Sequence, residues 1–147
     1  MLQSQAAAER CKVAVVTGIS ERSKGGRTCY NAIVGYNKHG KLLGVHRKVL
    51  PTYAERYFWG QGDGAGLRVW ISALGKLGSL ICWEHTMNSF RQAMAEQGVL
   101  IHAAHWPGLS KFGGFEMVAT IQNDAQSCSD SAMLHGVRIQ SELSTIL

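Results

Sequence analysis

The chain has 147 residues, a length that suits one domain, and apolar residues make up 46% of it. Charged residues make up 17%, which is typical of a globular protein and excludes an intrinsically disordered one. The net charge is +5, but the basic residues are scattered and lack the aromatic interleaving of a nucleic-acid-binding stripe. We therefore interpret residues 1–147 as one domain and expect no nucleic-acid partner.

The apolar runs and the cysteines indicate a cellular location. The longest apolar runs, such as Leu80–Cys82 and Val99–Ala104, are far too short to span a bilayer. The N-terminal segment has no basic stretch ahead of an apolar core, so we expect no signal peptide, no membrane partner and a cytoplasmic location. No two cysteines form a CxxC pair, so we expect no zinc site and reduced thiols at Cys11, Cys29, Cys82 and Cys128.

The first half of the chain predicts one helix, three strands and a long loop. Alanines favour the end of a helix over residues 1–10. Strands are predicted over Lys12–Ile19, which is apolar on both faces, and over Thr28–Tyr36 and Lys41–Val45, which form a hairpin. Residues 46–66 follow no period, and a loop of that length inside a compact domain is often functional.

The second half predicts two strands, a helix and a strand. Leu67–Ser72 and Lys76–Cys82 flank a turn at Gly75. The helix covers Asn88–Gln97, with Asn88 as N-cap, Phe90 and Met94 on one face, and Gly98 just past its end. The last strand is Val99–Ala104, and it ends before Trp106-Pro107-Gly108. This order of elements predicts a mixed α/β layered domain.

Cys82 ends an apolar strand and precedes Trp83, Glu84 and His85. A strand that runs into a tight turn and a helix can hold a side chain out of the sheet, next to backbone N–H groups. Such groups lower the pKa of a thiol and can bind a developing oxyanion. A cysteine in this place can equally be a small buried filler, so the position by itself leaves both interpretations open.

Lys48 follows the predicted hairpin, and Glu55 lies seven residues further on. A lysine at a strand end can stabilise a tetrahedral intermediate by its charge, and a glutamate can hold its ammonium in place. The alternatives are a solvated lysine in a basic loop and a surface ion pair of little energetic value.

The histidines suggest two further kinds of site. His102 and His105 are three residues apart, but no carboxylate or cysteine stands beside them at a metal-ligand spacing, so we expect no metal. A Cys–His hydrolase of the papain type would pair Cys82 with one of the histidines, but the local cysteine signature of that family is absent.

Three segments taken together resemble one enzyme family. They are HRKVLPTYAERYFWGQGDG over residues 46–64, LGSLICWEH over residues 77–85, and HAAHWPG over residues 102–108. Their order and spacing resemble the nitrilase branch of the carbon–nitrogen hydrolase superfamily. The resemblance extends upstream through VVTGISER and the hairpin, and it is strongest over residues 12–117. The CWEH and WPG forms look like those of aliphatic nitrilases and cyanide-degrading relatives.

The resemblance implies a fold and a set of site residues. The fold is a four-layer α-β-β-α sandwich. Cys82 matches the nucleophile, Lys48 the lysine and Glu55 the second glutamate of the family's catalytic set, with Trp83 and Glu84 as supporting residues. The base glutamate is not found in this chain, because the family carries it on an earlier strand. The pattern also fades after Met117, so the chain resembles a partial domain that lacks the N- and C-terminal parts.

The implied function is hydrolysis of a small-molecule nitrile to a carboxylic acid and ammonia through a cysteine thioimidate and a thioester. No cofactor is implied, and a homo-oligomer is expected. Since the base glutamate is not found, we expect little turnover from this chain alone. Two alternatives stay open. One is a cyanide-degrading or amidase relative, and the other is a non-catalytic remnant that acts as an interaction or oligomerisation module.

Overall fold

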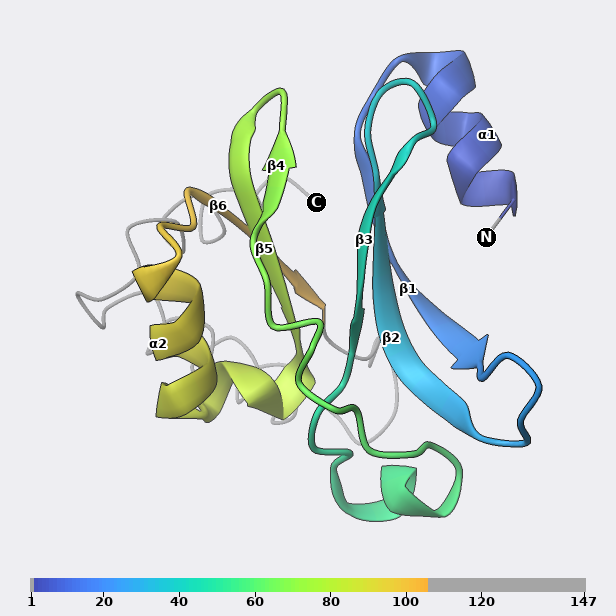
Figure 1. The fold of residues 1–147 in the computed structure, drawn as a ribbon, viewed down its shortest axis with the longest axis vertical. Coiled ribbons are helices and arrows are strands. Elements are labelled where there is room, and N and C mark those ends of the chain that lie inside the picture. Colours follow the sequence, from blue (N-terminus) through green and yellow to red (C-terminus); the bar gives the residue numbers. More distant parts are fainter. Residues whose placement is uncertain (1, 106–147) are drawn as a thin grey trace, which may run out of the picture.

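The computed structural model describes residues 2–105, which form two three-stranded sheets and two α-helices (Figure 1). The elements in chain order are α1 (Leu2–Cys11), β1 (Val15–Arg22), β2 (Cys29–Tyr36), β3 (Leu42–Arg47), β4 (Trp70–Ser72), β5 (Gly75–Ile81), α2 (Asn88–Glu96) and β6 (Ile101–His105). Two short 3-10 helices, η1 (Tyr53–Tyr57) and η2 (Cys82–Thr86), lie between them. None of the helices in this part of the chain is long and apolar enough to cross a bilayer.

The two sheets differ in how their strands run. The first has the order β1-β2-β3 with both pairs antiparallel. The second has the order β4-β5-β6, in which β4 and β5 are antiparallel and β5 and β6 are parallel. The parallel pair is joined through α2, as a parallel connection requires a crossover. The central strands β2 and β5 carry the longest buried runs, since both of their faces are covered.

Three apolar clusters lie at the three interfaces between the layers. Ala8 of α1 packs with Val34 and Tyr36 of β2. The second cluster lies between the sheets and contains Ile33, Trp70, Leu77, Ile81 and Cys82. In the third, Leu80 packs against Met94 and Val99 on the side of α2. The described residues therefore follow the layer order α-β-β-α, which confirms the predicted fold class (Figure 1).

The predicted strand Lys12–Ile19 is wrong at its start and in its burial. Lys12 has a φ of 55°, and the Val13 N–H donates to the Ala8 carbonyl at 3.2 Å. This hydrogen bond is the pattern of a helix C-terminus, so the chain reaches extended backbone at Val15. β1 is half-exposed: exposed and partly buried residues alternate along its second half, so one face of the strand is left uncovered.

Two strands near the site begin later than predicted. Residues 67–69 precede β4, because the N–H groups of Leu67 and Arg68 close a turn and that of Val69 donates to Gln97 Oε1 at 3.0 Å. Val99 precedes β6, because its N–H donates to the Met94 carbonyl at 3.2 Å at the end of α2. Gly98 has a φ of 72° and follows the helix, which confirms its predicted place.

The helix α2 is confirmed with one correction at its start. Met94 is buried and Phe90 packs against the same cluster, as the spacing of these residues predicts. Met87, and not Asn88, is the N-cap residue. Asn88 lies inside the first turn, where its Oδ1 accepts a hydrogen bond from Arg91 Nη2. The predicted end of the last strand at Trp106-Pro107-Gly108, and the segment after Met117 in which the family pattern fades, lie outside the described residues.

Candidate functional site

Cys82 lies where β5 ends and η2 begins, as the sequence predicts. Its φ is 53°, a left-handed conformation that costs a non-glycine residue on the order of 1–3 kcal/mol and is concentrated at functional sites. The residue is buried between the two sheets, in the cluster with Ile33 and Ile81. The thiol is free, as it is at Cys11 and Cys29, while Cys128 lies outside the described residues.

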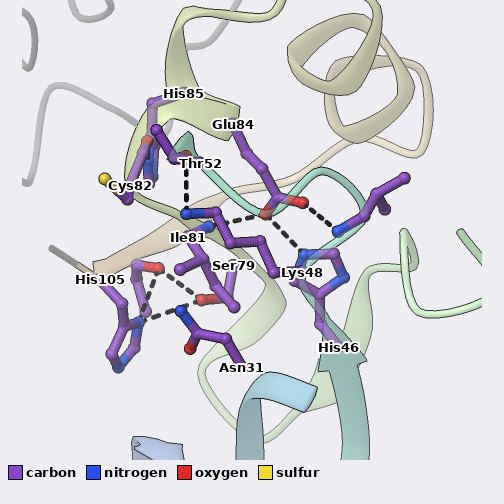
Figure 2. A network of polar contacts seen from close by, with 12 residues as sticks. Asn31, His46, Lys48, Thr52, Ser79, Ile81, Cys82, Glu84, His85 and His105 are labelled. Atoms are coloured by element: carbon purple, nitrogen blue, oxygen red, sulfur yellow. Dashed lines mark hydrogen bonds and ion pairs between the residues drawn. The ribbon is translucent and has the colours of Figure 1, made fainter. Parts of the chain in front are cut away.

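Lys48 is fully buried, with 0% of its surface exposed. It directly follows β3, where its N–H donates to the Asn31 carbonyl at 2.8 Å and its carbonyl accepts from Gly62 N–H at 2.9 Å. Its ammonium Nζ donates to Glu55 Oε2 at 2.6 Å. It also donates to Thr52 Oγ1 at 3.0 Å (Figure 2). The alternative of a solvated lysine in a basic loop is therefore wrong.

Glu55 lies in η1 and receives three hydrogen bonds. Its Oε2 accepts from Lys48 Nζ at 2.6 Å and from the Thr52 N–H at 2.5 Å. Its Oε1 accepts from Asn31 Nδ2, on β2, at 3.3 Å. The long loop over residues 46–66 thus brings Lys48 and Glu55 together, and the ion pair is no surface contact because the lysine is buried.

Glu84 connects the segment of Cys82 to the segment of Lys48. It is fully buried in η2. Its Oε2 accepts from Ile81 N–H at 2.9 Å and from His46 Nε2 at 2.8 Å, and its Oε1 accepts from Val49 N–H at 2.7 Å. Since Ile81 precedes Cys82 and Val49 follows Lys48, one carboxylate holds together the chain segments that carry the thiol and the ammonium (Figure 2).

The pKa of Cys82 departs from the sequence-based expectation. Burial raises it, while the Lys48 ammonium and the Trp83 backbone N–H lower it, and Glu55 and Glu84 raise it further. The net direction is upward. The expected lowering by N–H groups is therefore present but outweighed, because desolvation penalises the thiolate more. The side chain of Trp83 is exposed, so its contribution to the thiol comes from its backbone.

His85 and His102 form a buried pair beside Cys82. His85 Nδ1 lies 2.6 Å from the Cys82 carbonyl oxygen, and His85 Nε2 lies 3.0 Å from His102 Nε2. Burial lowers the pKa of His85 to about 4 and that of His102 to about 3, so both imidazoles are neutral at neutral pH.

His102 and His105 do not form a pair with each other. They are three residues apart on β6, and an odd spacing places two side chains on opposite faces of a strand. His105 Nδ1 instead lies 3.3 Å from Ser79 Oγ. Within residues 2–105, three or more metal-ligating side chains do not come together in a metal-binding group.

The part that four residues play in the site was not predicted from the sequence. These residues are Asn31, His46, Thr52 and His85, the last through its contact with His102. Thr52 could have been found, because Thr52 and Glu55 form the Thr-x-x-Glu pattern of a helix start. Asn31, His46 and the partner of His85 carry no local signal. Asn31 comes from β2 and His102 from β6, and these contacts depend on how the two sheets pack.

The arrangement combines the groups that addition to a polarised carbon requires. It holds a thiol at a strained turn, a backbone N–H that faces the sulfur, and a buried cation that lowers the thiol pKa. Such groups can stabilise a thiolate and the negative charge that develops after its attack.

Comparisons with known proteins point to one enzyme family. Residues 1–127 match the sequence model of the carbon–nitrogen hydrolase family. The bifunctional nitrilase/nitrile hydratase NIT4B of Lupinus angustifolius is 43% identical over 99 residues, which cover 67% of this chain and 28% of that protein. Nitrilase 3 of an unknown prokaryotic organism is 42% identical over 107 residues, which cover 73% of this chain and 32% of that protein. The chain thus spans less than a third of these relatives.

Solved structures show the same fold at lower identity. A carbon–nitrogen hydrolase from Helicobacter pylori G27 superposes with a TM-score of 0.72 at 22% identity, covering 85% of this chain and 45% of that one. Nit3 of Saccharomyces cerevisiae, a nitrilase-superfamily member, gives a TM-score of 0.71 at 21% identity, covering 85% and 44% of the two chains. The likeness confirms the sandwich fold and that this chain corresponds to part of it.

Proposed function

Because the chain belongs to the carbon–nitrogen hydrolase family, we propose that it carries the nucleophilic half of a nitrile-hydrolysing site. In this proposal Cys82 is the nucleophile, Lys48 stabilises negative charge, and Glu55 holds Lys48 in place. The observation that carries the proposal is the fully buried Lys48 ammonium, held by Glu55 at 2.6 Å and acting on the pKa of Cys82. Burying a lysine ammonium costs desolvation free energy, and an apolar side chain could fill a merely structural position without that cost.

The reaction begins with attack of the Cys82 thiolate on the nitrile carbon. A carbon–sulfur bond forms, one carbon–nitrogen π bond breaks, and the nitrogen takes the proton that the thiol has released. The product is a covalent thioimidate. Lys48 and the Trp83 N–H lower the pKa of the Cys82 thiol, and in this proposal they also stabilise the negative charge that passes from sulfur to nitrogen during the addition.

Two water molecules complete the proposed reaction. The first adds to the thioimidate carbon, and after proton transfer to nitrogen the carbon–nitrogen bond breaks and ammonia leaves, giving a thioester. The second water hydrolyses the thioester, which releases the carboxylic acid and restores the Cys82 thiol. The atoms balance as one nitrile and two waters giving one acid and one ammonia.

The proton acceptor is the group that the described residues do not supply. Glu55 and Glu84 are the carboxylates that act on the pKa of Cys82, and both already accept three hydrogen bonds. A positioned proton-transfer group contributes on the order of 10² to 10⁴ in rate. We therefore expect slow turnover from these 147 residues alone.

The first test looks for covalent chemistry as well as turnover. The chain is incubated with an aliphatic and an aryl nitrile, and ammonia, acid and amide are measured together with the intact mass. Amide is included because the relative from Lupinus angustifolius bears the name of a bifunctional nitrilase/nitrile hydratase. We expect a mass increase of one nitrile on Cys82 and slow release of ammonia.

The controls are Cys82→Ala and Cys29→Ala, since Cys29 is a partly buried free thiol away from η2. Cys82→Ala should lose both the adduct and the ammonia, while Cys29→Ala should keep both. Equal ammonia from the chain and from Cys82→Ala, or an adduct that survives in Cys82→Ala, would refute the role of Cys82.

A second candidate function is that of an association module, and exposed aromatic side chains on η1 favour it. Tyr53 is 88% exposed, Tyr57 86% and Phe58, just after η1, 74%. Side chains of this size and exposure are common where a partner surface packs. In this proposal the chain forms homo-oligomers, or associates with a longer protein of the same fold, in the cytoplasm.

Light scattering after size-exclusion chromatography tests the second candidate. If η1 makes the contact, Tyr57→Ser lowers the mass of the assembly, whereas Ile71→Ser, at an exposed position of β4, leaves it unchanged. A monomeric parent chain, or equal effects of the two variants, would contradict association through η1.

A further inference from the structure

The backbone carbonyl of Cys82 is held by a side chain of its own 3-10 helix. His85 Nδ1 lies 2.6 Å from this oxygen, and the oxygen can only accept. His85 therefore donates from Nδ1. Because the carbonyl belongs to the residue with a φ of 53°, this hydrogen bond acts on the strained turn that aims the sulfur.

The tautomer of His85 determines that of His102. A neutral imidazole has one donor and one acceptor nitrogen, so His85 Nε2 is an acceptor. His102 Nε2, 3.0 Å away, must then donate to it. This leaves His102 Nδ1 as a buried lone pair without a hydrogen-bond partner among the described residues. The result is a directed chain of donors that runs from β6 through His85 to the carbonyl of Cys82.

We propose that His85 and His102 are positioning residues that hold the Cys82 carbonyl, so that the thiol stays beside Lys48 and the Trp83 N–H. The inference rests on the proposed role of Cys82 as nucleophile. In this proposal His102 holds the ring of His85 from β6, against which it packs edge-on with the two ring centroids 5.1 Å apart.

The neutral state of the pair is part of this arrangement. A proton on His85 Nε2 would place two N–H groups against each other across 3.0 Å. The charged and titratable groups that act on His85 come from three elements: Glu84 on η2 favours the imidazolium, and His46 on β3 and His105 on β6 oppose it. Burial outweighs Glu84, so the donor chain persists at neutral pH.

Two amide substitutions separate the two bonds of His85. The amide nitrogen of asparagine can occupy the place of Nδ1, and that of glutamine the place of Nε2. His85→Asn therefore keeps the bond to the Cys82 carbonyl, and His85→Gln loses it while filling the space toward His102. The readout is the rate of iodoacetamide alkylation of Cys82 as a function of pH, followed by mass spectrometry with Cys11 as internal reference, since Cys11 is exposed.

We expect His85→Asn to keep the rate at neutral pH within about twofold of the parent rate. His85→Gln should lower it about tenfold and move the midpoint of the pH profile upward, because the thiolate loses the Trp83 N–H and Lys48. Equal profiles for the two variants, or loss in His85→Asn alone, would overturn the proposal. A general loosening of the fold would instead raise the accessibility of Cys82 in both variants.

A second pair of variants covers the case in which His85→Gln does not fold, as judged by near-ultraviolet circular dichroism. His102→Gln keeps a donor toward His85, and His102→Leu removes it while filling the space. The alkylation rate should stay near the parent rate in His102→Gln and fall several-fold in His102→Leu, and equal rates would overturn the proposal. Since alkylation needs no turnover, the result is independent of whether the chain hydrolyses nitriles.

Discussion

At the scale of single residues, Lys48 combines burial with charge. Its ammonium is out of water and is compensated by Glu55 at 2.6 Å and by the Thr52 hydroxyl at 3.0 Å. Removing a charge of this kind leaves its partner unpaired, which is the main cost of breaking a buried ion pair. The same charge lowers the pKa of Cys82 against the effect of burial, so the residue has both a structural and a chemical effect.

Lys48→Met tests the chemical effect. Methionine fills most of the space without the charge, so the pKa of Cys82 should rise further and its alkylation near neutral pH should slow about tenfold, equivalent to one pKa unit. Lys38→Met, at an exposed position of the turn before β3, is the matched control and should leave the rate unchanged. A parental rate in Lys48→Met would show that the ammonium does not act on the thiol.

Glu84→Gln tests the carboxylate that joins the two segments. Glutamine has one acceptor oxygen, whereas Glu84 receives three N–H donors, so at least one buried donor meets an NH₂ group. The expected loss of unfolding free energy is about 1–3 kcal/mol, measured by urea denaturation. Glu96→Gln, at an exposed end of α2, should change it by less than about 0.5 kcal/mol. Similar losses in both variants would contradict the joining role.

At the scale of elements, the packing of the two sheets depends on one tryptophan and two glycines. Trp70 of β4 lies against Gly35 of β2 and Gly44 of β3. A Cβ added at Gly44 would lie 2.2 Å from Trp70 Nε1, and one at Gly35 would lie 2.5 Å from Trp70 Cζ3. The indole therefore needs both positions to carry no side chain, and any added atom forces the sheets apart.

Gly44→Ala should destabilise the fold by about 1–3 kcal/mol through overpacking. Gly18→Ala is the matched control, because its Cβ would meet His105 Cδ2 at an ordinary 3.9 Å, and its effect should be small. In a Trp70→Leu background the cost of Gly44→Ala should shrink, because the clashing ring is gone. An undiminished cost there, measured by thermal unfolding, would show that the indole is not the cause.

The elements also show what the sequence could and could not predict. The hairpin around Asn37–Gly40, the helix α2 and the strand that leads into Cys82 follow from local patterns, and the structure contains them, with β5 ending one residue earlier, at Ile81. The starts of β1, β4 and β6 could not be located, because backbone N–H groups there close helix ends and turns or donate to Gln97. Local sequence patterns also could not predict the burial of Lys48, because it depends on a carboxylate in η1 that is itself held by an asparagine on β2.

At the scale of the whole molecule, the layers bury two imidazoles that an unfolded chain would expose. The pKa of His85 is lowered to about 4 and that of His102 to about 3, from an ordinary value of 6.5. Below pH 6.5 the unfolded chain binds protons that the folded chain does not, so proton binding lowers the free energy of the unfolded state and the folded state becomes less stable. The stabilising contribution is fully present above this value and is lost as the pH falls toward 4.

We therefore expect the unfolding free energy to drop between about pH 7.5 and about pH 5 by roughly 2 kcal/mol for each of the two histidines. Urea denaturation at the two pH values measures the drop. His102→Leu should remove the part of the drop in unfolding free energy that His102 causes. Replacing the exposed His39 with glutamine should leave the drop unchanged. A stability independent of pH in this range would show that the pair is not held neutral by the fold.

The thiol and the ammonium belong to different sheets, since Cys82 follows β5 and Lys48 follows β3. A small molecule that bonds to the sulfur and contacts the ammonium therefore spans the seam of the sandwich. By mass action such a molecule favours the docked arrangement of the sheets over the separated one. Binding of the molecule and packing of the two sheets would then be one coupled equilibrium. A molecule bound at both groups would therefore stabilise the sandwich against separation of its sheets.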